Sequence, residues 1–152
     1  MNSTWTDRGL LVLRIALGLV FVMHGWQKLT VLGIDGVAGF LAGLGIPAPN
    51  VAAVLLTTTE LGGGLALIAG VFTRVASAFI AFSMLVAVTT VHLKNGFFLP
   101  NGYEFALTML LANVAMTMTG AGRYSLDHLL FSRHTHIEVT VTERVFPTRR
   151  AA

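Results

Sequence analysis

The sequence predicts an all-α integral membrane protein, a bundle of four transmembrane helices with almost no soluble domain. Apolar residues make up 55% of the 152 residues and charged residues only 11%, against about 25% charged residues in a typical soluble domain. The mean hydropathy is +0.76. A soluble chain of this length needs far more charge on its surface, so we expect most of the outer surface to face lipid.

Four apolar segments are long enough to cross the hydrocarbon core, which takes about 20 helical residues. They span residues 10–29, 51–71, 75–93 and 103–119. Turn-forming residues separate them, such as Gly-Ile-Pro-Ala-Pro-Asn at 45–50. Between the first two, residues 33–45 are apolar at helical spacing but too short to span. They predict a short interfacial or re-entrant helix.

The two ends of the chain complete the predicted organisation, with a membrane domain at 1–128 and a basic tail at 129–152. We expect the first apolar segment to be a retained helix, because no Ala-x-Ala cleavage site follows it. In the tail, Ile137, Val139 and Val141 alternate with polar residues as in a short strand; disorder or docking onto a partner are the alternatives.

Basic residues predict the orientation in the cell inner membrane. With four spans, eight of the ten Lys and Arg residues lie on the side that holds the N-terminus, the loop at 72–74 and the tail. Both termini are therefore expected in the cytoplasm. We expect the net charge of +3 to interact with anionic lipid headgroups rather than with nucleic acid.

The absence of cysteine excludes several kinds of chemistry within this chain. Disulfide exchange, thiolate nucleophiles, iron–sulfur ligation and cysteine-based zinc sites all require a thiol. Any redox role must therefore take its electron carrier from elsewhere.

Polar residues inside the predicted spans are the candidate functional residues, because a charge at the centre of a bilayer costs about 2.5–3.5 kcal/mol on insertion scales. In the predicted topology one group lies near the outer membrane boundary, and Glu60 lies below it. We expect them to line a polar cavity in the outer half of the bundle. The group comprises His24, Lys28, His92 and Glu104.

Each candidate also has a purely structural interpretation. Lys28 and Glu104 lie near enough to the boundary to reach the headgroups, and the histidines suit structural hydrogen bonds. Glu60 would alternatively pair with Arg14. Two histidines on different helices permit haem or a His/Glu metal site, but two ligands are a weak signal, and neither is favoured. The glycines at 18, 25 and 62–64 predict close helix packing, with a flat ligand ring as the alternative.

Several motifs together resemble the DoxX family of small four-helix membrane proteins, over about residues 8–128. They are Arg14-x3-Gly18-x2-Phe21-x2-His24-Gly25-x2-Lys28-Leu29, Gly45-Ile-Pro-x-Pro, Glu60-Leu-Gly-Gly-Gly-Leu, Gly70-x3-Arg74, His92-x2-Asn95-Gly-Phe-Phe, Gly102-Tyr-Glu and Gly120-x-Gly-Arg-x-Ser-Leu-Asp127. The resemblance implies a link to quinol oxidation, thiosulfate–quinone chemistry or oxidative-stress complexes with redox partner proteins. Distant relatives act in cargo export or receptor assembly.

The leading hypothesis is a membrane redox subunit that binds a quinone. Its expected partners are the lipid bilayer and a redox partner protein, and the sequence is also compatible with a homo-oligomer. A quinone needs an apolar slot and polar groups at its two carbonyls. We assign catalytic roles to His24, Glu60, His92 and Glu104, and ligand-binding roles to Arg14, Lys28, Asn95 and Tyr103. The alternatives are a non-catalytic partner or assembly factor, and a small transporter or lipid-binding protein.

Overall fold

The computed structural model describes residues 3–130, and within that range the chain is helical and contains no strand. The predicted strand near 137–141 lies outside the described residues. The all-α prediction is therefore confirmed for the described residues.

The first helical unit is longer than one membrane span. Helix α1 (Ser3–Gln27) passes directly into a π-helical turn, η1 (Lys28–Leu32), and then into α2 (Gly33–Gly43). Gly33 has a φ of 69°, a conformation that only glycine adopts readily, and it changes the direction of the chain there. The short helix predicted over 33–45 is therefore present as α2, joined to α1 without an intervening loop.

The remaining helices match the other apolar segments. Helix α3 (Pro49–Ala69) begins with a proline, which is favoured in the first turn because its missing N–H would have no helical partner. Helix α4 (Thr73–Ala87) continues through a π-helical turn, η2 (Val88–His92), and a 3₁₀ turn, η3 (Leu93–Asn95). Helix α5 (Glu104–Thr119) follows. Three helical units are long and apolar enough to cross a membrane, and α5, with 16 residues, is shorter.

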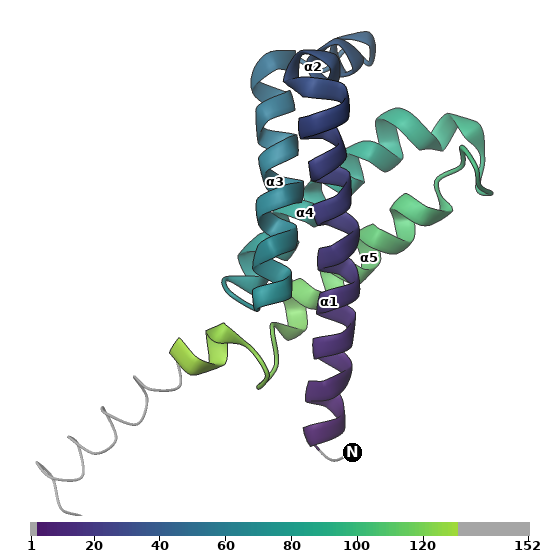
Figure 1. The fold of residues 1–152 in the computed structure, drawn as a ribbon. Helices are drawn as coiled ribbons and strands as arrows, with labels where there is room; N and C mark the ends of the chain where they lie inside the picture. The colour runs from purple at the N-terminus through teal and green to yellow at the C-terminus, as the bar shows by residue number, and fades with distance from the viewer. Residues whose placement is uncertain (1–2, 131–152) are drawn as a thin grey trace, which may run out of the picture.

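Two pairs of helices make up the fold. Helices α1 and α3 lie side by side, with α2 across one end of them, whereas α4 and α5 form a hairpin that leans away and carries its connection far from α1 and α3 (Figure 1). The core lies where the hairpin crosses the first pair. It combines buried side chains of all four long helices: Leu17, Phe21, Leu67, Ile80 and Met116.

A second apolar cluster holds α2 against the start of α3. Val37, Ala38 and Leu41 of α2 are buried against Ala53. The short helix is therefore part of the packed structure, and it fixes the end of the α1–α3 pair at which the candidate site lies.

Candidate functional site

The backbones of α1 and α3 pack in direct contact along a line of glycines. A Cβ added to Gly25 would lie 2.5 Å from the backbone nitrogen of Leu61, and one added to Gly64 would lie 2.7 Å from the nitrogen of Val22. At Gly18, the added atom would lie 2.7 Å from the carbonyl oxygen of Gly64. Side chains are excluded at these distances, so the predicted close helix packing is confirmed at these three positions.

This close approach brings a charged residue from each helix together. The Nζ atom of Lys28 lies 2.6 Å from Oε2 of Glu60, and the two side chains are 19% and 4% exposed. A charge-assisted hydrogen bond of this length is strong where water is excluded. Glu60 therefore pairs with Lys28 rather than with Arg14, the partner that the sequence offered as an alternative.

A hydroxyl group that sequence reasoning did not identify lies beside this ion pair. Thr57 precedes Glu60 by one turn on the same face of α3, is 3% exposed, and has a buried Oγ1 without a hydrogen-bond partner within the described residues. Its neighbour Thr58 instead donates to the carbonyl oxygen of Val54 in its own helix, at 2.7 Å. The Thr-Thr-Thr run at 57–59 was the available signal.

His24 lies one turn before Lys28 on α1, with its side chain exposed. Its ring is 6.4 Å from the ring of Phe105 at the start of α5. This contact connects the α1–α3 pair to the hairpin. Within residues 3–130, three or more potential metal ligands do not gather at any point.

The other residues predicted to line a cavity in the outer half of the bundle lie in the connection between the end of α4 and the first residue of α5. Nδ1 of His92 is 3.1 Å from the carbonyl oxygen of Asn101, and Nδ2 of Asn95 donates to the same oxygen at 3.2 Å. Glu104 accepts a hydrogen bond from the backbone N–H of Leu99 at 2.9 Å.

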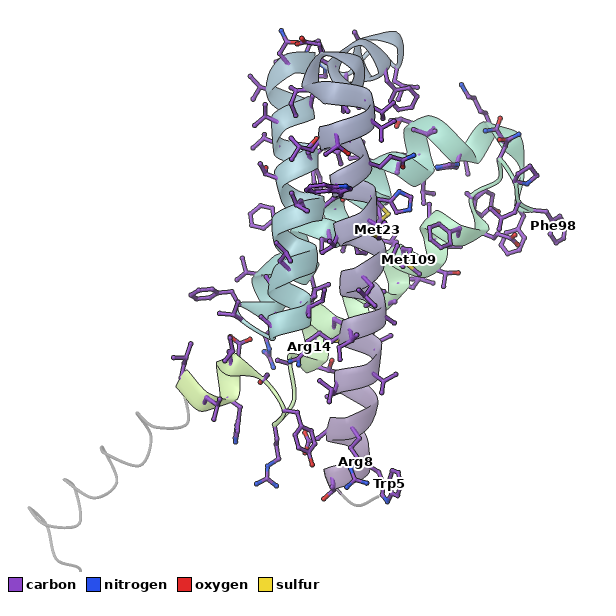
Figure 2. The ribbon with its side chains drawn as sticks, in the orientation of Figure 1. Trp5, Arg8, Arg14, Met23, Phe98 and Met109 are labelled. Atoms are coloured by element: carbon purple, nitrogen blue, oxygen red, sulfur yellow. The ribbon has the colours of Figure 1, made fainter. Side chains whose placement is uncertain are left out.

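Tyr103 belongs to the same connection, where its ring meets Phe97 edge to face, with 5.3 Å between the centroids. The connection projects away from α1 and α3, with Phe98 at its far end (Figure 2). His92, Asn95, Tyr103 and Glu104 therefore shape the connection, whereas Lys28, Thr57, Glu60 and His24 form a separate group, which we call the α1–α3 site.

Arg14 lies at the opposite end of the bundle. Its guanidinium donates to the backbone carbonyls of Ala121 at 3.3 Å and Tyr124 at 2.7 Å, and the residue is 2% exposed. It also rests on Gly70, whose φ of 69° and missing side chain leave room for it. The structure thus gives Arg14 partners in the chain segment after α5, away from the other predicted site residues (Figure 2).

The same segment secures the start of α4. The carboxylate of Asp127 accepts hydrogen bonds from the backbone N–H groups of Phe72 at 2.7 Å and Thr73 at 3.0 Å. These N–H groups have no partner within their own helix, and a negative charge there is favourable. Arg14 therefore fixes the 120–127 segment to α1, and Asp127 fixes it to the start of α4.

Comparisons with known proteins identify relatives of this chain. The family model described as DoxX matches residues 9–93. "Putative oxidoreductase CatD" of Bacillus subtilis is 31% identical over 131 residues, which cover 86% of this chain and 92% of that protein. "Inner membrane protein YqjF" of Escherichia coli is 32% identical over 126 residues, which cover 82% of this chain and 93% of that protein. "Inner membrane protein YphA" of the same organism is also 32% identical, and 78% of this chain and 87% of that protein are covered. No solved structure gives a significant match.

Proposed function

The chain belongs to the DoxX family of membrane proteins, and from this premise we propose that it is a redox-associated inner-membrane protein that binds a quinone at the α1–α3 site. The name of the Bacillus subtilis relative, "Putative oxidoreductase CatD", supports the redox role. The names of the two Escherichia coli relatives support a location in the inner membrane. The observation that carries the proposal is an ion pair with a buried carboxylate, Glu60, together with the buried hydroxyl of Thr57 one turn away, which has no partner within the described residues.

The residues of the α1–α3 site fit the chemistry of a quinone head. Its two carbonyl oxygens accept hydrogen bonds and its ring is flat and apolar. Thr57 has a donor hydroxyl free for such an oxygen, and Lys28 brings a cation for negative charge that develops on the ring. The rings of His24 and Phe105, tilted by 42° to one another, supply aromatic surface at the edge of the site.

The bound quinone supplies the electron-pair chemistry, and the chain's own residues handle protons. Reduction of a quinone to a quinol takes up an electron pair and a pair of protons. The chain has no cysteine, and we assign the supply of electrons to a redox partner protein. We assign proton transfer to the carboxylate of Glu60, whose Oε2 accepts a hydrogen bond from Lys28. We assign the second proton-transfer role to His24, one turn before Lys28 on α1.

The proposal also includes a topology. Helix α5, with 16 residues, is the fourth span, and both termini lie in the cytoplasm because of the excess of Lys and Arg at that end. The α1–α3 site then lies in the outer half of the membrane. Labelling of single cysteines introduced at Thr4 and Lys94, with a thiol reagent that does not cross membranes, tests it.

Binding of a short-chain quinone analogue to the purified protein tests the function. Thr57→Val removes the hydroxyl at nearly constant volume, and we expect affinity to fall roughly tenfold because a ligand carbonyl loses its donor. Thr58→Val is the matched control, since that hydroxyl is already bonded within its own helix. Equal affinity of both variants and the unchanged protein, or no binding at all, would refute the proposal.

One observation favours a second candidate, a non-catalytic partner or assembly factor. Lys28 and Glu60 already satisfy one another at 2.6 Å, as expected of a pair that only fixes two helices. In that case the paired variants Lys28→Met and Glu60→Gln would leave every redox activity of the assembled complex unchanged while lowering its stability.

A further inference from the structure

An open hollow on the exposed side of α4, facing away from the other helices, lies apart from the α1–α3 site. It measures about 420 Å³ and is lined by Arg74, Val75, Ala78, Phe79 and Phe82. These positions recur at helical spacing and so form one stripe, about 12 Å long by helical rise. Val75, Phe79 and Phe82 are 55%, 62% and 65% exposed. In a membrane protein this surface faces lipid.

Arg74 closes one end of this hollow with a charge that has no partner among the residues that the structure describes. It lies in the first turn of α4, its side chain is exposed, and it makes no hydrogen bond or ion pair within residues 3–130. Asp127, a carboxylate at this helix end, accepts hydrogen bonds from the N–H groups of Phe72 and Thr73.

The position of the Arg74 side chain is also defined. Its Nε lies 3.0 Å from where a Cβ of Gly120 would be, so it rests on the turn after α5. Gly120 has a φ of 82° and presents no side chain there. The guanidinium is therefore held beside the apolar stripe at the end of the span.

We propose that this surface binds a phospholipid with an anionic headgroup, with its phosphate on Arg74 and one acyl chain along Val75, Ala78 and Phe82. A guanidinium binds phosphate oxygens through paired, charge-assisted hydrogen bonds. The lining of the hollow below it is apolar, as an acyl chain requires. Arg8, also exposed at this end of the bundle, adds positive charge that favours anionic lipid.

A second copy of the chain fits the same surface less well. In a membrane dimer the two-fold axis runs along the membrane normal, so each residue meets residues of equal depth. Pairing through this stripe would bring the two Arg74 side chains together without a counterion. The phospholipid instead supplies a negative charge at that depth.

Native mass spectrometry of the full-length protein in detergent tests this site. The protein is mixed with phosphatidylglycerol, which is anionic, or phosphatidylcholine, which is zwitterionic. We expect the unchanged protein to retain phosphatidylglycerol preferentially, and Arg74→Gln to bind it roughly tenfold more weakly. Arg123→Gln is the matched control, an exposed arginine at the same end but outside the hollow, and should bind as the unchanged protein does.

A second variant tests the acyl-chain part. Ala78 is exposed, so Ala78→Trp fills the hollow without disturbing the core, and should lower the retention of both lipids. Far-ultraviolet circular dichroism confirms that each variant is folded. Equal retention of the two lipids, or full retention by Arg74→Gln or Ala78→Trp, would overturn the proposal, as would a change from dimer to monomer in these variants. None of these outcomes bears on quinone binding at Thr57.

Discussion

Gly25→Ala tests whether direct backbone contact between α1 and α3 builds the candidate site. The added Cβ would lie 2.5 Å from the backbone nitrogen of Leu61 and 2.8 Å from its Cα. Carbon atoms pack at about 3.5–4.0 Å, so the helices must separate by about 1 Å. Backbone atoms cannot rotate away as the end of a flexible side chain does.

The expected cost follows from this overlap. Overpacking of a tightly packed core typically costs about 1–3 kcal/mol, and each kcal/mol corresponds to about 2–4 °C in Tm for a chain of this size. Thermal unfolding in detergent, followed by circular dichroism, measures the change. Because Lys28 lies one turn from Gly25, the same displacement should weaken its 2.6 Å contact with Glu60 and reduce quinone affinity.

Gly62→Ala is the matched control for this experiment. It lies in the middle of α3, and nothing lies within 4 Å of an added Cβ. An alanine there removes a residue with poor helix propensity, so stability should stay constant or rise by up to about 1 kcal/mol. A Gly25→Ala variant as stable as Gly62→Ala would refute the close packing on which the site depends.

Two further predictions concern charges. Lys28→Met leaves the Glu60 carboxylate buried without a counterion and should lower the free energy of unfolding by about 3–5 kcal/mol; adding Glu60→Gln should recover part of that loss, and strictly additive effects in chemical denaturation would contradict the pairing. Asp127→Asn weakens the hydrogen-bond acceptor at the start of α4 and should lower the free energy of unfolding by about 1 kcal/mol. Asp35→Asn is the control, because Asp35 lies in the first turn of α2 without a capping hydrogen bond; it should change the unfolding midpoint much less.

The helices could be predicted from the sequence because apolar length alone determines them. The segments predicted at 51–71 and 103–119 correspond to α3 (Pro49–Ala69) and α5 (Glu104–Thr119) within two residues at each end. The short helix over 33–45 was also predicted. The two π-helical turns were not, because nothing in local composition distinguishes them from the α-helices that they extend, yet they contain Lys28 and His92.

It was harder to predict which polar residues lie together, because this depends both on their depth in the membrane and on the direction in which each helix presents them. Helical rise gives depth, whereas tilt and rotation depend on side-chain packing. His92 and Glu104 share a depth with His24 in the predicted topology, but the α4–α5 hairpin leans away (Figure 1). Lys28 reaches the deeper Glu60 because helical side chains point back toward the N-terminus of their helix.

The Lys28–Glu60 pair is more than is needed to hold α1 and α3 together. The glycines at 18, 25 and 64 already bring the two backbones into contact, and a buried ion pair is often no more stabilising than apolar side chains of similar size. The same helix contact could therefore be made with Met and Leu at these two positions. The buried carboxylate of Glu60 and the Thr57 hydroxyl, which has no partner within the described residues, add nothing to such packing, whereas the proposed quinone site requires groups of these two kinds.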